Sequence, residues 1–398
     1  MDLVIAHPFL SQRGGVERVV LEIAKKFNPV IYTVTYQPES TFSEFKDFDV
    51  RVLPRSALEK PFFFLRGDAR RSGAVSAGFR YYLTKIKDDY DVINAHGTPS
   101  EWIRNRNERV CWYCHSPNRE AFDLYEFRMR ELSLPRKILN SGLISAYKAA
   151  ENSAVPRIEK IVCNSEVTNA RIKKYLDRND AEVISPGVDP KEFSNEGYSK
   201  YFLCPSRIVP EKRFEYAIEA FRAFCARKKG LPDASGKFSP NTSAKGWKLV
   251  ISGFLPKNYR ERKYLEFLKR LADGLEVEFK LDVSDPELKK LYANYYSVLF
   301  SAMNEDWGLV PLEAMACEKP CISVNEGGPA LSIKDGKTGF LVNSPAQMAE
   351  KMLLLAENPG ENEKMGKEGR KHVLKNYTWG IFLDTLEAAF KEAAGKRS

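Results

Sequence analysis

The sequence has few cysteines and no long apolar run, and each absence argues against a class of protein. Its 398 residues include seven cysteines, an odd number with irregular spacing, so we expect no disulfide framework and a reducing, cytoplasmic location. No stretch approaches the roughly 18 uncharged apolar residues that a membrane-spanning helix needs. The first residues, Met1 to Ala6, lack the basic segment of a secretion signal.

Two common phosphate-binding motifs are also missing. The sequence contains neither Gly-x-Gly-x-x-Gly nor Gly-x-x-x-x-Gly-Lys-Ser/Thr. It therefore supports neither the nicotinamide fingerprint nor a Walker loop. Its apolar and charged fractions, 43% and 29%, are those of an ordinary globular protein, and its length predicts two domains or more.

The net charge of +9 is concentrated in one window, residues 51–87. Nine basic residues face only two acids there, and Phe62, Phe63, Phe64, Tyr81 and Tyr82 lie among them. Such a window predicts contact with an anionic membrane surface through peripheral association. A solvated basic face with its aromatic residues in the core is the alternative. Nucleic acid is the least favoured partner, because no nucleic-acid motif accompanies the charge.

Short apolar runs alternate with amphipathic helical patterns, which predicts an α/β fold with parallel sheets. In the first half the predicted strands are Leu3–Ala6, Val30–Val34, Asp91–Ala95, Arg109–Cys114 and Lys160–Cys163. In the second half they are Tyr201–Pro205, Lys248–Ser252, Val277–Lys280, Ser297–Ser301 and Pro320–Val324. Helices are predicted after Gly14-Gly15 and over Arg213–Lys228, Glu287–Tyr296 and Ala346–Glu357, the last capped by Ser344.

A proline- and glycine-rich linker, Ser185–Pro190, separates the two sets of strands. We expect two doubly wound domains, residues 1–190 and 191–377, with binding crevices beyond the carboxyl ends of their strands. A further helix is predicted over about 378–398, where Phe382, Leu386, Ala389 and Phe390 share a face. Residues 228–246, rich in Lys, Pro, Ser and Gly, are expected to form a mobile surface insertion.

Three of the four histidines, His7, His96 and His115, each follow a predicted strand of the first domain. A titratable group at that edge can donate a hydrogen bond to a substrate hydroxyl or phosphate near neutral pH. Capping or surface roles are the alternative for any one of them, and the fourth, His372, is expected to be structural. The Gly14-Gly15 pair would let a ligand approach the backbone, although a plain turn would use the same residues.

The second domain carries cations and carboxylates at its strand ends. Arg207 and Lys212 beside a helix start can clamp a diphosphate, with a surface pair as the alternative. Glu305 and Glu313 follow the strand Ser297–Ser301, and carboxylates accept hydrogen bonds from sugar hydroxyls. Glu326 lies in a similar polar turn after the next strand.

These residues resemble the paired-glutamate motif of retaining GT-B glycosyltransferases of family four. Further points of resemblance are Gly14-Gly15-Val16-Glu17-Arg18, Tyr113-Cys114-His115-Ser116-Pro117, Asn164-Ser165, Pro186-Gly187-Val188-Asp189, and Arg207 with Lys212. They occur in family order over nearly the whole chain. The first two stretches look most like mannosyltransferases that act on lipid-linked oligosaccharides.

The resemblance implies two Rossmann-like domains facing across a central cleft, with the C-terminal helix of about 378–398 packed back on the first domain. It also implies a role for each matching residue. Glu313 would bind the ribose of a GDP- or UDP-linked sugar. Glu305 would bind the donor sugar together with the backbone of Asp306, Trp307, Gly308 and Leu309. Arg207 and Lys212 would hold the diphosphate, Gly14, Gly15 and Gly253 would approach the donor, and His115 would touch its sugar. His7, His96 and Glu326 are assigned to the acceptor side or left open.

The implied reaction transfers a hexose, mannose by the narrower resemblance, to a lipid-linked or glycan acceptor at the cytoplasmic membrane face. It needs no metal and no cofactor beyond the nucleotide-sugar substrate. Glu318 and Phe254 stand where the family usually has glycine. A soluble synthase or phosphorylase making a small glucoside is one alternative, and a non-enzymatic basic α/β scaffold is another. Cys111 and Cys114 would point to opposite faces of a strand, which argues against zinc.

Overall fold

The computed structural model describes residues 1–55, 69–130, 132–228, 246–255 and 259–395. The chain divides into two units, each of which is described by itself. The first comprises Met1–Pro186 with Phe382–Ser398, and the second comprises Gly187–Ile381. The predicted insertion at 228–246 lies almost entirely outside the described residues.

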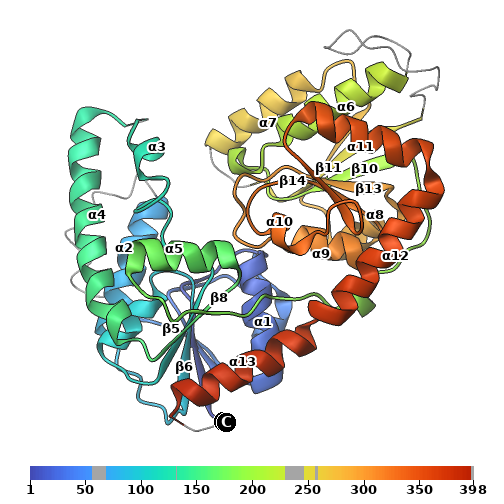
Figure 1. Ribbon diagram of the computed structural model, residues 1–398. Coiled ribbons are helices and arrows are strands. Elements are labelled where there is room, and N and C mark those ends of the chain that lie inside the picture. Colours follow the sequence, from blue (N-terminus) through green and yellow to red (C-terminus); the bar gives the residue numbers. More distant parts are fainter. Residues whose placement is uncertain (56–68, 131, 229–245, 256–258, 396–398) are drawn as a thin grey trace. The chain divides into compact units, whose positions relative to one another are not determined.

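The first unit is built on one parallel sheet in the order β5-β3-β1-β6-β7-β8-β9 (Figure 1). Its strands are β1 (Leu3–Ala6), β3 (Val30–Thr33), β5 (Val50–Val52), β6 (Val92–His96), β7 (Val110–Cys114), β8 (Lys160–Cys163) and β9 (Glu182–Val183). A two-stranded sheet pairs β2 (Phe9–Leu10) with β4 (Thr35–Tyr36).

The helices of this unit follow the strands. They are α1 (Gly15–Phe27), α2 (Ala69–Leu83), α3 (Tyr125–Arg130), α4 (Leu134–Ala154) and α5 (Glu166–Leu176), with 3-10 turns η1 (Ser43–Asp47), η3 (Ser100–Asn105) and η4 (Val155–Arg157). The C-terminal helix α13 (Trp379–Ala393) packs on the same unit. Its Phe390 ring lies 5.7 Å from that of Phe27, and Lys26 forms an ion pair with Asp384 at 2.8 Å.

The second unit repeats the plan with a six-stranded parallel sheet in the order β12-β11-β10-β13-β14-β15. Its strands are β10 (Tyr201–Pro205), β11 (Lys248–Gly253), β12 (Val277–Leu281), β13 (Ser297–Phe300), β14 (Cys321–Val324) and β15 (Gly339–Val342). Its helices are α6 (Phe214–Lys228), α7 (Tyr259–Leu271), α8 (Asp285–Asn294), α9 (Leu309–Ala316), α10 (Pro329–Ser332), α11 (Pro345–Glu357) and α12 (Pro359–Asn376), with η5 (Pro190–Glu192) and η6 (Pro210–Lys212).

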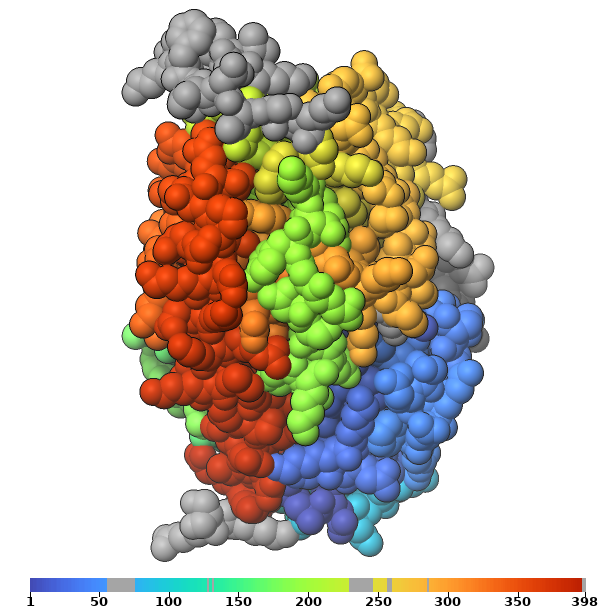
Figure 2. Space-filling view, turned by 90° about the vertical axis from the view of Figure 1, so that its right-hand side faces the viewer, coloured from blue at the N-terminus to red at the C-terminus, as the bar shows by residue number. Residues whose placement is uncertain are grey.

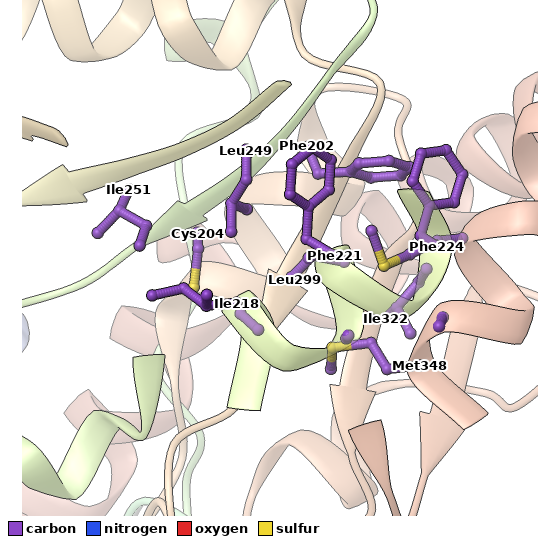
Figure 3. Close-up of a cluster of buried hydrophobic side chains, with 14 of the residues drawn as sticks. Phe202, Cys204, Ile218, Phe221, Phe224, Leu249, Ile251, Leu299, Ile322 and Met348 are labelled. Carbon is purple, nitrogen blue, oxygen red and sulfur yellow. The ribbon is translucent and has the colours of Figure 1, made fainter. Parts of the chain in front are cut away.

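The larger core of the second unit is aromatic. Phe202 of β10 stacks on Trp247 with ring centres 5.0 Å apart. Phe221 and Phe224 of α6 pack in the same cluster as Phe202 (Figure 3). Burying rings of this size contributes heavily to folding, because each removes a large apolar area from water. The segment after Gly187 lies on the surface along α12, where Arg370 donates to the carbonyls of Pro190 and Phe193 (Figure 2).

The predicted α/β class is confirmed, and the predicted strands are present with shifts of one residue at some ends. Ser344 caps α11 by accepting from the amide of Gln347, as expected. The helix predicted over Glu287–Tyr296 instead begins at Asp285, because Ser284 and Glu287 form a capping box, and it ends at Asn294. Five short strands, β2, β4, β5, β9 and β15, were not predicted; β15 begins at a glycine, which gives no strand signal.

Candidate functional site

The second unit has its topological switch point between β10 and β13. From β10 the chain continues to β11 on one side, whereas β13 lies on the other side. Ligands of open α/β sheets bind outside the carboxyl ends of the strands at such a point. Lys212 follows β10 and Glu305 follows β13, so two residues singled out by the sequence flank this point.

Lys212 and Glu305 are in direct contact. The Lys212 Nζ lies 2.6 Å from Glu305 Oε2, and their side chains are 12% and 29% exposed. The Ser301 hydroxyl interacts with the main-chain carbonyl of Lys212 at 2.9 Å, which fixes the turn that carries the lysine. A cation and a carboxylate therefore meet at this edge of the sheet. An anionic group of a ligand can bind the lysine there, and hydroxyl groups of the same ligand can bind the glutamate.

Arg207 lies at the same end of β10 and is exposed. Within the described part of the chain its side chain has no ion pair or hydrogen bond. Its guanidinium is thus available to an anion, whereas Lys212 is engaged by Glu305. The diphosphate clamp of these two cations stays a prediction.

A second ion pair, between Arg213 and Glu326, supports the loop of Glu305, and its arginine was not predicted from the sequence. Arg213 adopts a left-handed backbone (φ 48°), donates from Nε to the Ser301 carbonyl at 2.8 Å, and pairs with Glu326 at 2.9 Å. The other Glu326 oxygen accepts from the amide of Asn304 at 3.2 Å. Glu326 therefore holds the loop of Glu305 in place. The sequence had assigned Glu326 to the acceptor side or left its role open, and did not predict this contact.

Gly327 and Gly328 pack against the same loop. Gly327 has φ 65°, and a Cβ there would collide with the backbone of Glu305. The Gly328 amide donates to the Glu305 carbonyl at 2.7 Å. Glycine is required here because two backbones touch, and the contact fixes the position of Glu305.

Helix α9 begins at this loop with its amides unshielded by a side chain. Its N-cap, Gly308, has φ 82° and provides no capping side chain. A helix N-terminus with free N–H groups attracts anions such as phosphate. Trp307 does not face a ligand with its ring, because it is buried against Tyr377 at 5.3 Å. The predicted donor contact of Trp307 therefore concerns its backbone.

Glu313 lies one turn into α9 and is held by a tyrosine that was not predicted. The Tyr292 hydroxyl donates to Glu313 Oε2 at 2.6 Å. Burial and the nearby Glu313 charge raise the pKa of Tyr292 well above its ordinary value, so the phenol keeps its proton and remains a donor. The hydrogen bond from Tyr292 thereby orients the half-buried Glu313 carboxylate.

Gly253 has a structural explanation. A Cβ on Gly253 would collide with the carbonyl of Ser206, at the turn leading to Arg207. The glycine therefore lets β11 pack on that turn. This packing is sufficient to explain the glycine at position 253, and the predicted approach of Gly253 to a donor stays a prediction. A separate surface hollow, lined by Tyr201, Phe279 and Leu291 among others, contains none of the predicted site residues.

In the first unit the switch point lies between β1 and β6, and the three histidines meet there. The His7 Nδ1 lies 3.2 Å from the carbonyl of His96. The His96 Nδ1 lies 3.0 Å from His115 Nε2, with their ring centres 5.2 Å apart. The carboxyl edge predicted from the strand ends thus gathers all three side chains.

The hydrogen bonds fix which nitrogen of each ring carries its proton. Asn94 donates from Nδ2 to the Cys111 carbonyl at 3.1 Å, so its Oδ1 accepts from His96 Nε2 at 2.5 Å. The neutral His96 ring then has its lone pair on Nδ1, which accepts from His115 Nε2. The lone pair of His115 is therefore on Nδ1.

This arrangement corrects the predicted chemistry of His115. Burial lowers its pKa to about 3, with a further lowering from His7, and burial lowers the pKa of His96 well below its ordinary value. Neither ring titrates near neutral pH. His115 can accept a hydrogen bond from a hydroxyl through Nδ1, and the expected donation to a substrate is lost.

The Gly14-Gly15 turn holds an acid. A Cβ on Gly14 would collide with Glu17 Oε2, and the buried Glu17 carboxylate lies 3.8 Å from His7 Nε2. Burial would raise the pKa of Glu17, but His7 and a hydrogen bond from Gln12 lower it overall. The space beside Gly14 is thus filled by the protein itself, whereas Gly15 is exposed at the start of α1.

The basic window 51–87 does not form one free basic face in its described part. Arg80 is buried and donates to the Leu53 carbonyl at 2.9 Å, and Tyr81 is buried as well. Arg51 pairs with Asp49 and Asp88. Side chains 56–75, with Phe62, Phe63 and Phe64, lie outside the described residues.

Three general properties bear on the site. Among the described side chains, no three His, Cys, Asp or Glu residues could together hold a metal ion. All seven cysteines are free thiols. Within the residues that the structure covers, no helix combines the length and the apolar character needed to cross a bilayer.

Sequence profiles of known families match both halves of the chain. Residues 13–192 match "Glycosyltransferase Family 4", and residues 188–372 match "Glycosyl transferases group 1". The chain is 24% identical to alpha-1,3/1,6-mannosyltransferase ALG2 of Dictyostelium discoideum over 98% of each chain. It is 32% identical to a probable sucrose-phosphate synthase of Thermosipho melanesiensis over 50% of this chain and 44% of that one.

Among solved structures, the chain resembles Anabaena Alr3699/HepE, crystallised in complex with UDP-glucose. The two superpose with a TM-score of 0.72 at 15% identity, over 98% of this chain and 99% of that one. At that identity the likeness concerns the fold.

Proposed function

The chain belongs to the GT-B glycosyltransferases of family four, and on that premise we propose that it transfers mannose from a nucleotide-sugar to a lipid-linked or glycan acceptor at the cytoplasmic face of a membrane. The observation that carries the proposal is the contact of Lys212 with Glu305 at the switch point of the second unit, beside the uncapped start of α9. The choice of mannose is supported by the ALG2 relative, which matches over nearly its full length.

Each residue of this site has a proposed role in binding the donor. Arg207 and Lys212 hold the diphosphate, and the amides that open α9 add to that attraction. Glu305 leaves Lys212 and accepts hydrogen bonds from the sugar hydroxyls. Glu313, oriented by Tyr292, accepts from the ribose hydroxyls.

The proposed reaction retains the anomeric configuration. The acceptor oxygen attacks the anomeric carbon on the face from which the diphosphate leaves. The new carbon–oxygen bond forms as the bond to the diphosphate breaks, and the departing phosphate oxygen takes the acceptor's proton. Lys212 and Arg207 stabilise the charge that develops on the leaving group, which is the role a metal ion has in other transferases. His115 accepts a hydrogen bond from a sugar hydroxyl and transfers no proton.

The test supplies the purified chain with GDP-mannose, UDP-glucose and UDP-N-acetylglucosamine, each with a prenyl-diphosphate-linked oligosaccharide. We expect one hexose to be added from GDP-mannose, an α linkage in the product by NMR, and the same rate after treatment with EDTA. Glu305→Gln should remove most of the activity, whereas Glu326→Gln, at the bracing ion pair, should reduce it less. An unchanged rate for Glu305→Gln would contradict the proposal.

A second candidate is synthesis of a small soluble glucoside, and one observation favours it. The relative with the highest identity among those described is the probable sucrose-phosphate synthase. Its match covers only half of this chain, so we rank it second. Offering a sugar phosphate as acceptor separates the candidates, because a synthase would use it in preference to the prenyl-linked one.

A further inference from the structure

The N-terminal turns of α4 expose an apolar tip that no described residue of the first unit covers. Leu134 and Ile138 are 72% and 68% exposed, and Leu139 beside them is 38% exposed. Figure 1 shows this end of α4, with α3 next to it, reaching past the strands of the sheet. Single exposed aliphatic residues are common, but three within two turns form a patch that requires an explanation.

Cations outnumber acids around the patch. Glu126 and Glu131 precede it in the sequence, and from Leu132 to Ala150 there is no Asp or Glu. Arg130, Arg136 and Lys137 lie beside the apolar tip, and in the described part of the chain none of the three forms an ion pair. Unneutralised positive charge next to exposed apolar side chains complements an anionic surface with an apolar interior.

The other end of α4 is firmly anchored, so the exposed end is a rigid projection. Glu151 accepts from Trp102 Nε1 at 2.6 Å, and the Tyr147 ring lies 5.2 Å from the Trp102 ring. Ala154 is fully buried. A helix fixed at one end presents its tip at a constant position, and docking it requires little further loss of conformational freedom.

We propose that the tip formed by Leu134, Ile138 and Leu139, with Arg130, Arg136 and Lys137 around it, docks into an anionic lipid bilayer. The aliphatic side chains would enter the interfacial region, and the cations would contact lipid phosphates. A protein partner would need an acidic rim around an apolar pocket to match this tip, whereas an anionic bilayer has both features. We therefore favour the bilayer. The inference extends the proposed function, because a lipid-linked acceptor lies in a bilayer, but the docking itself requires no sugar chemistry.

This surface differs from the one that the sequence predicts. In the described part of window 51–87, Arg80 is buried and Arg51 is neutralised by Asp49 and Asp88. Arg130, Arg136 and Lys137 form no ion pair with any residue that the structure describes. Lys85 and Lys87 of the window are exposed and provide a matched charge control. Leu374 of α12, 50% exposed in the second unit, provides a matched apolar control.

The experiment is sedimentation of the full chain with vesicles of phosphatidylcholine containing phosphatidylserine, and with vesicles of phosphatidylcholine alone. We expect binding to the anionic vesicles that weakens with added salt. Leu134→Ser with Ile138→Ser should lower the partition coefficient at least about tenfold. Arg136→Gln with Lys137→Gln should lower it about fivefold for each cation. Leu374→Ser and the Lys85→Gln, Lys87→Gln pair should change it by less than about twofold.

Two results would overturn the inference. One is vesicle binding that is unchanged in the Leu134→Ser, Ile138→Ser variant. The other is a dimer in analytical ultracentrifugation that this variant dissociates, because a second copy would then cover the tip. Transfer to a short, water-soluble prenyl acceptor is measured in parallel. The variant should retain that activity, so loss of docking and failure of the proposed function give different results.

Discussion

Replacing Glu313 by Gln separates the ribose contact from the structural role of the same residue. Glutamine keeps the shape of the side chain, and its carbonyl oxygen can still accept from the Tyr292 hydroxyl, which lies 2.6 Å from Glu313 Oε2. The other atom of the side chain, which is proposed to contact the ribose, then changes from a carboxylate oxygen that accepts hydrogen bonds into an amide nitrogen that donates them. Hydrogen bonds to charged groups contribute about 1.5–3 kcal/mol, so we expect nucleotide binding to weaken about 10- to 150-fold.

The assay is isothermal titration calorimetry with GDP and with UDP. Ribose is common to both nucleotides, so the fold loss should be the same for each. The free energy of unfolding should change by less than about 1 kcal/mol, because the buried tyrosine keeps its partner. Tyr292→Phe is the matched control, with an intermediate loss of affinity, since it frees the carboxylate without removing it.

Two results would refute this reasoning. Unchanged affinity of Glu313→Gln for both nucleotides would remove the carboxylate from the ligand. A loss for GDP alone would place it at the base.

Three further predictions test other parts of the structure. Lys212→Met should lower kcat by about 100- to 1000-fold, as for loss of one preorganised charge-stabilising group, with Lys212→Arg restoring only part of it in steady-state assays; equal rates would contradict the clamp. Asn94→Ala, which releases the His96 tautomer, should lower kcat about fivefold through loss of one hydrogen bond and leave the Kd for GDP within about twofold; a changed Kd with unchanged kcat would contradict the positioning role. Glu101 and Glu151 are buried carboxyls whose pKa values burial raises, so their stabilising effect is complete below the unfolded pKa of about 4.3 and is lost as pH rises through the folded values. In urea titrations from pH 4.5 to 7, the free energy of unfolding of Glu101→Gln should therefore rise relative to that of the wild type, by up to about 1.4 kcal/mol per pH unit. A difference between the two proteins that does not change with pH would refute the buried proton.

The predictable part of the site follows from the geometry of parallel strands. Because the carboxyl ends of parallel strands share one edge of a sheet, residues that follow separate strands can be grouped from sequence alone. The three histidines were grouped in this way. Lys212 and Glu305, 93 positions apart, were each expected at the site, but their mutual contact was not predicted.

The missed parts depend on contacts that no local pattern encodes. Arg213 reaches Glu326 because its backbone is left-handed, and an arginine gives no sequence signal for that conformation. Tyr292 approaches Glu313 from the preceding helix, and a tyrosine in an amphipathic pattern indicates only a core position. The charge of window 51–87 was misleading for Arg80, because composition does not show that an arginine can bury its stem and donate to main-chain carbonyls.

The central claim is that the donor diphosphate binds at the carboxyl edge of the second unit, between the turn after β10 and the start of α9. Hydrogen–deuterium exchange of the full chain, with and without saturating GDP, measures this directly. We expect slower exchange in segments 206–213 and 304–313, which carry Arg207, Lys212, Glu305 and Glu313. Protection confined to other segments, with these two unchanged while GDP is bound, would contradict it.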